Sequence, residues 1–126
     1  MANIVQVEQQ NLVNGWLGIA AYTAATTPMK LALTTTSPTS TAAGTEVTGG
    51  SYGRQTITFG APTAATPSTA TATAVSFTSM PAAVVTSVNV YDNAGTPIRR
   101  AFGDLTASKT TAAGDTLTVT VTASIG

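Results

Sequence analysis

The chain has 126 residues, of which almost four in ten are threonine or alanine and none is histidine or cysteine. Only 8% of the residues are charged, and the acidic and basic side chains cancel. Without imidazole or thiol, the chain lacks the usual general base, the soft metal ligands and the best nucleophile. We therefore expect no enzyme activity, no cofactor and no metal. The neutral charge also argues against nucleic acid or an anionic membrane as a partner.

The length fits one domain, and 43% apolar residues at zero net charge argue against disorder. No apolar run is long enough to span a membrane. The N-terminus lacks a basic region followed by an apolar core, so no secretory signal is visible. We therefore expect synthesis in the cytoplasm of the cell that makes the protein.

The first expected element is a helix over residues 4–22. Apolar residues recur there three and four positions apart, in one stripe of Leu12, Trp16 and Ile19 and another of Val13, Leu17 and Ala20. Gly15 and Gly18 disfavour the helix but would let another chain approach closely. Trp16 has two readings, as a residue packed on its own sheet or as an anchor in a subunit contact. We place a domain boundary here, with a helix or arm over 1–27 and a β-domain over 28–126.

Strands and turns follow from Met29 onward. Alternating apolar residues predict strands over residues 29–36, 52–59, 72–78, 84–91, 98–105 and 116–122. In the strand over 84–91, the alternation places Val84, Thr86, Val88 and Val90 on one face. The low-complexity stretches 34–43 and 60–74 are expected to be loops or arms. The pattern predicts a mainly β fold, a small antiparallel β-sandwich of Ig-like or jelly-roll-like type, with one N-terminal helix.

The apolar faces of these strands define an expected core. Its members are Ile57, Phe59, Val75, Phe77, Val88, Val90, Leu117, Val119 and Val121. Truncation of such a residue leaves a cavity, so the phenylalanines are expected to matter most for stability.

Few residues are candidates for chemistry. Asp92 and Asp115 both fall in expected turns, where an aspartate most often accepts backbone N–H bonds, although a pair of carboxylates could also bind calcium. Arg99 and Arg100 are adjacent on a strand and cannot share a face, so one is expected to be solvated. Arg54 has two open readings, an ion pair with Glu46 across the Gly-Gly turn or an exposed strand arginine.

Several runs carry a resemblance to a known family. They are Leu31-Ala32-Leu33, residues 36–39, residues 44–59 with the pattern E-V-x-G-G-x-Y-x-R-Q, Val90-Tyr91-Asp92, residues 101–110 and residues 113–115. Together, over residues 29–125, they resemble small virion proteins of tailed bacteriophages, variously labelled head decoration, tail fibre or minor tail proteins. The resemblance implies a structural virion protein.

Three functions are compatible with that resemblance. The first is a capsid decoration protein on the capsid exterior that bridges major capsid protein subunits, in contact with copies of itself, with a trimer as one arrangement. The second is a tail fibre or minor tail protein, and the third is a carbohydrate-binding or hydrolytic module. The candidate interface residues are Leu12, Trp16, Ile19, Arg54, Arg99 and Arg100.

Overall fold

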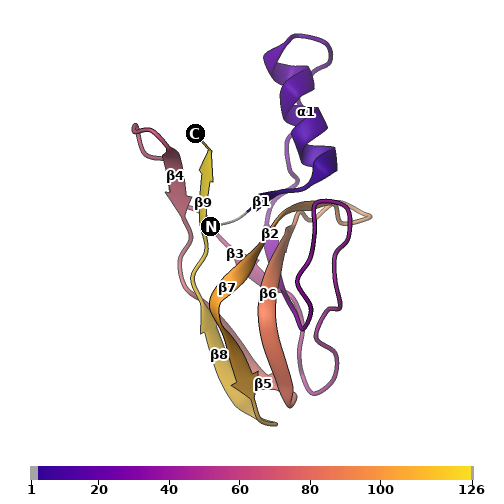
Figure 1. Cartoon of the computed structure of the whole chain (residues 1–126), viewed down its shortest axis with the longest axis vertical. Coiled ribbons are helices and arrows are strands. Elements are labelled where there is room, and N and C mark those ends of the chain that lie inside the picture. Colours follow the sequence, from indigo (N-terminus) through magenta and orange to yellow (C-terminus); the bar gives the residue numbers. More distant parts are fainter. Residues whose placement is uncertain (1–2, 126) are drawn as a thin grey trace.

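The computed structural model describes residues 3–125 and shows antiparallel sheets with one helix at one end (Figure 1). The elements are β1 (Asn3–Ile4), α1 (Gln6–Trp16), β2 (Met29–Thr34), β3 (Gln55–Ile57), β4 (Ser68–Thr71), β5 (Val75–Met80), β6 (Ala83–Tyr91), β7 (Arg99–Thr111), β8 (Asp115–Val119) and β9 (Thr122–Ile125). This architecture confirms the predicted fold class, a mainly β sandwich with an N-terminal helix.

The strands form three antiparallel groups. A five-stranded sheet has the order β1-β7-β6-β2-β3, and β5 pairs with β8 while β4 pairs with β9. The β5–β8 pair packs across the core from the large sheet. Figure 1 shows α1 and the β4–β9 ribbon projecting from the same end of the body, with α1 reaching further.

The core lies between the large sheet and the β5–β8 pair. Its members are Leu31, Leu33, Val47, Ile57, Ala72, Val75, Phe77, Met80, Val85, Val88, Val90, Leu117, Val119 and Val121. All of the expected core residues are buried except Phe59, which packs half-buried against the cluster. Alternation therefore predicted the buried faces correctly, because a strand that packs on one side buries every second residue.

The alternation fails at the start of β6. Val84 is 49% exposed and Val85 is fully buried, the reverse of the expected arrangement. The pairing of β6 with β7 shifts between Val85 and Ser87, which face Lys109 and Asp104 respectively. Because an irregularity of this kind changes which side chains point inward, the face assignment of Val84 was wrong while that of Val88 was right.

The helix is shorter than expected. It ends at Trp16 instead of residue 22, and Gly18 lies just beyond it with a φ of 68°. This left-handed conformation ends helices and is easy only for glycine. The chain then folds back along the helix, because the side chain of Asn11 both donates to and accepts from the backbone of Thr23, at 2.9 Å each way.

The stretch over residues 60–74 also differs from the expected loop. Its residues Ser68–Thr71 form β4, which pairs with the distant β9 in the register Ser68 to Ile125 through Thr71 to Thr122. A short polar strand of this kind depends on its partner edge, which local sequence does not reveal. At the other terminus, β1 joins the large sheet by pairing with β7. The domain boundary at residue 27 stays a prediction.

Candidate functional site

A buried ion network attaches α1 to the large sheet. Arg100 of β7 donates from Nη1 to Glu8 of α1 and from Nη2 to Oδ2 of Asp92, at 3.1 Å in the second case. The exposed fractions of Arg100, Glu8 and Asp92 are 8%, 8% and 1%. Tyr22 donates its hydroxyl to the second oxygen of Glu8. The base of the helix is therefore fixed by charge-assisted hydrogen bonds.

The surroundings of Asp92 favour its charged form. Burial raises the pKa of Asp92, but hydrogen bonds from the backbone N–H groups of Ile98 and Ala94 and from Arg100 outweigh burial and lower the pKa below its ordinary value. The expected role of Asp92 as a turn-former is confirmed by these bonds. Asp115 has the same role, since its Oδ2 accepts from the N–H of Ala112 at 2.8 Å.

Arg99 and Arg100 do take opposite faces of β7. One of them was expected to be solvated, but both make hydrogen bonds within the chain. Arg100 is held in the network, and Arg99 donates to Oδ1 of Asn89 at 3.2 Å and to the carbonyl of Thr39 at 2.8 Å. Its guanidinium also lies over the ring of Phe102, and burial lowers the pKa of Arg99. The solvated reading was wrong because the other face of β6 and β7 is covered by the loop that contains Thr39.

The pairing of Arg54 with Glu46 is confirmed. Arg54 donates to both oxygens of Glu46, at 2.9 Å and 3.1 Å, and its guanidinium lies 3.8 Å from the ring centre of Tyr91. The hydroxyl of Tyr52 donates to the same carboxylate at 2.8 Å. Burial alone would raise the pKa of Glu46. The hydrogen bonds from Arg54 and Tyr52 outweigh burial, so the pKa of Glu46 lies below its ordinary value. All three candidate arginines are thus engaged within the chain.

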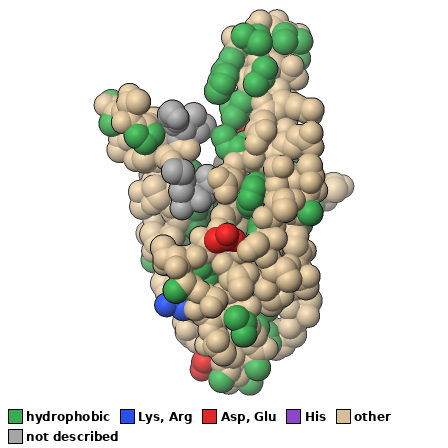
Figure 2. Space-filling model, viewed as in Figure 1, with side chains coloured by type: hydrophobic (Ala, Val, Ile, Leu, Met, Phe, Trp, Pro, Cys, Tyr) green, Lys and Arg blue, Asp and Glu red, His purple; other side chains and the backbone are tan. Residues whose placement is uncertain are grey.

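The far end of α1 differs from its hydrogen-bonded base, because the apolar side chains at the far end face solvent. Five of the eight large hydrophobic residues that are exposed lie in the second half of α1 and just after it, namely Val13, Trp16, Leu17, Ile19 and Tyr22. We call these five residues the apolar tip. Figure 2 shows hydrophobic side chains gathered over this end of the molecule. A shallow apolar hollow lies among them, lined by Leu12, Gly15, Trp16, Gly18, Ala20, Ala21 and Tyr22.

The candidates Leu12, Trp16 and Ile19 belong to this region, and the structure does not bring the three arginines to it. Trp16 is 67% exposed and Ile19 is 68% exposed, so neither packs on the sheet. Sequence reasoning missed Glu8 and Tyr22 as partners of Arg100. One signal was present, since Glu8 is the sole charged residue among the first 29.

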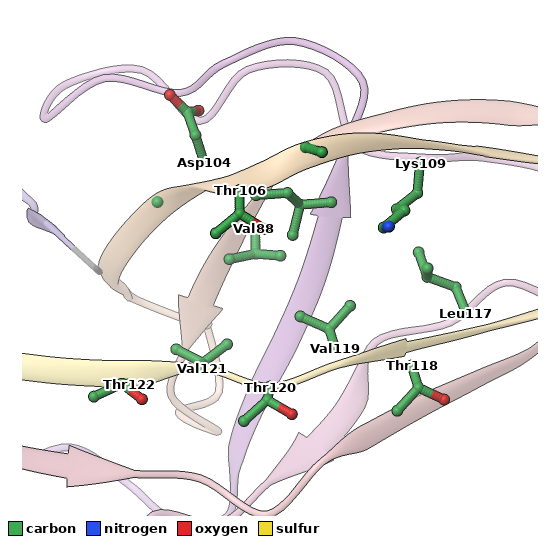
Figure 3. Close-up of a pocket in the computed structure, with 13 residues that line it drawn as sticks. Val88, Asp104, Thr106, Lys109, Leu117, Thr118, Val119, Thr120, Val121 and Thr122 are labelled. Carbon is green, nitrogen blue, oxygen red and sulfur yellow. The ribbon is translucent and has the colours of Figure 1, made fainter.

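A second hollow opens between β7 and β8, with a volume of about 210 Å³. Val88, Leu117, Val119 and Val121 point into it from the core, and Lys109 stands at its edge (Figure 3). Asp104 points away from the hollow in Figure 3, and its carboxylate accepts a hydrogen bond from Ser87 at 2.6 Å. Asp104 and Lys109 both line this hollow, but no ion pair joins these two described residues.

Between residues 3 and 125, no three acidic side chains gather as a metal site would require. Nor does the helix described there have the length and apolar character needed to cross a membrane. The surface that offers most to a partner is therefore the apolar tip.

The comparison with known families is decisive for identity. Residues 3–125 match the family model described as podophage GP4 fiber I protein gp80. The chain belongs to this family. It is accordingly a structural protein of a bacteriophage virion, which confirms the resemblance seen in the sequence. Neither the curated proteins nor the solved structures contain a match to the chain.

Proposed function

We propose that the chain is a subunit of a phage tail fibre and that it has no catalytic role. The carrying observation is the family match, which spans residues 3–125 and whose description names a fibre protein. Between the two structural readings of the sequence, this description favours the tail fibre over the capsid decoration protein.

The shape and chemistry of the molecule support a structural role. The body is elongated, with the apolar tip at one end and the turn between β7 and β8 at the other (Figure 1). Its charged side chains are largely used inside the chain, as in the pairs of Arg54 with Glu46 and Arg100 with Asp92. A surface with so little charge suits a protein that is packed against neighbours.

Labelling of intact virions tests the location. Antibodies against the chain, viewed by electron microscopy, should mark the tail end of the particle, and quantitative mass spectrometry should count from a few to some tens of copies. Labels distributed over the whole head, together with hundreds of copies, would overturn the fibre proposal and restore the decoration reading.

Activity screening tests the non-catalytic part of the proposal. The purified chain should show no turnover on panels of glycan and peptide substrates, because histidine and cysteine are absent and the aspartates of the turns hold backbone N–H groups. Turnover that disappears in the Asp115→Asn variant would refute it, since this exposed aspartate can be changed without touching the buried network.

A further inference from the structure

We infer that the apolar tip is the contact surface for a second copy of this chain, in a twofold, tip-to-tip arrangement. Three of its side chains, Trp16, Leu17 and Ile19, are each more than 60% exposed in the single chain. Soluble monomers rarely expose large apolar side chains in one contiguous group, so a patch of this kind marks an interaction site.

The tip has the shape that a self-contact requires. Trp16 lines the hollow together with the small residues Gly18 and Ala20, and the exposed Leu17 and Ile19 are their neighbours in the chain. A methyl group built on Gly18 would meet nothing within 4 Å, so the space beside Gly18 is open. In a twofold contact, each copy offers the same surface, and the projections of one copy enter the hollow of the other. Tryptophan is also the side chain most enriched among the anchors of such contacts.

The charge pattern favours a copy of the chain over a lipid surface. No residue between positions 9 and 29 is charged, so two identical tips meet without repulsion between like charges. A helix that lies on a membrane surface typically carries lysine or arginine on its polar face, and this segment has neither.

The available area approaches that of a small specific interface. Each of the five side chains of the apolar tip keeps roughly 100 Å² exposed, so together they supply on the order of 500 Å² per copy, against ~600 Å² per partner at the low end of specific interfaces. The hollow and the neighbouring backbone add to that area. The β4–β9 ribbon does not stand in the way, because α1 reaches further from the body than the ribbon does (Figure 1).

The inference rests on the proposed fibre role in one respect, because it assigns a second copy of the chain to a surface through which a fibre subunit would assemble. Its test is independent, since self-association is measured on the purified chain and the fibre role is measured on virions. Failure of either can therefore be told from failure of the other.

Sedimentation equilibrium and tryptophan fluorescence of the full chain test the contact together. Trp16 is the sole tryptophan, so its emission reports directly on the tip. With rising protein concentration, the mass should increase from one copy to two while the Trp16 emission shifts to shorter wavelength. Monomers at all concentrations, with unshifted emission, would overturn the inference, and a trimer would overturn the twofold arrangement.

Matched variants locate the contact. Val13→Lys and Ala20→Lys place a charge on the helix face and in the hollow, and each should weaken association at least tenfold. Val84→Lys is the control, since Val84 is exposed to a similar degree, 49% against 43% for Val13, and lies at the opposite end of the body. Its association should match that of the unaltered chain. Weakening of self-association by Val84→Lys to the same degree would refute the self-contact. So would a shift of the Trp16 emission that appears only with anionic vesicles, or only with virions that lack this protein.

Discussion

Replacement of Arg100 by methionine tests whether the buried network holds the fold together. Arg100 is 8% exposed and its two carboxylate partners, Glu8 and Asp92, are buried as well. Methionine keeps much of the volume but removes the charge, which leaves two buried carboxylates without their cation. Removing one partner of a buried ion pair costs about 3–5 kcal/mol. Since a domain of this size is stable by about 5–15 kcal/mol, the variant should be strongly destabilised.

Urea unfolding followed by circular dichroism measures this loss, and the neighbouring arginine provides the control. Arg99→Met makes the same chemical change at a half-buried position without a carboxylate partner, and should cost about 1 kcal/mol. If Arg100→Met costs less than about 1 kcal/mol as well, Glu8 and Asp92 reach water when the arginine is gone, and the network does not anchor α1.

A rescue separates lost charge from lost packing. Adding Glu8→Gln and Asp92→Asn to Arg100→Met removes the two uncompensated charges while keeping the side-chain sizes. If charge is the cause, part of the lost stability returns, because a neutral buried polar group costs far less than a charged one. No recovery in the triple variant would show instead that the packing of the Arg100 side chain carries the effect.

Three further outcomes are expected. Phe77→Ala should cost about 3–5 kcal/mol because Phe77 is 1% exposed, and Phe59→Ala less than half of that, as measured by urea unfolding. Gly44→Ala should cost about 1–3 kcal/mol, since Gly44 has a φ of 71° and a Cβ there would lie 2.7 Å from a backbone oxygen, whereas Gly95→Ala, in open space, should change little. Glu46 has a lowered pKa in the folded chain, so its stabilising effect is present above the unfolded pKa of about 4.3 and is lost as the pH falls through the folded pKa. Thermal melting of Glu46→Gln should accordingly depend less on pH in acid than melting of the unaltered chain; an unchanged acid dependence would assign the effect to other carboxylates.

The sequence predicted the sandwich core because burial on one face of a strand leaves an alternating pattern. Phe77, Val88 and Leu117 were all found this way. The face assignments of Val84 and Val85 were reversed in the prediction. The register shift between β6 and β7 depends on how the two strands pair, and no residue type marks it in the sequence. For the same reason β4 was expected to be a loop, since its partner strand β9 lies about 50 residues further along the chain.

The candidate site was predicted only in part, because an apolar stripe on a helix looks the same whether it faces a core or solvent. The stripe correctly drew attention to Leu12, Trp16 and Ile19. It could not show that Trp16 and Ile19 are exposed, because that depends on how far α1 projects beyond the sheet. Nor could adjacent arginines reveal which of the two would find carboxylates 8 and 92 positions away in the chain.

The orientation of α1 follows from the one charged residue of the N-terminal segment. In an ordinary amphipathic helix the apolar stripe is buried and the charge faces water. Here Glu8 is buried at 8% exposure and Trp16 is exposed at 67%. The pairing of Glu8 with Arg100 fixes the first turn of the helix against β7. The helix then runs away from the body, so its last turn, which contains Trp16, is not covered by the sheet (Figure 1). The chain thus spends a buried ion pair, which is weak evidence for stability in itself, on holding an apolar surface outward. That arrangement is physically reasonable only if the surface is covered in the assembled state, which is why the apolar tip, and neither the arginines nor the hollow between β7 and β8, is the contact surface that we propose.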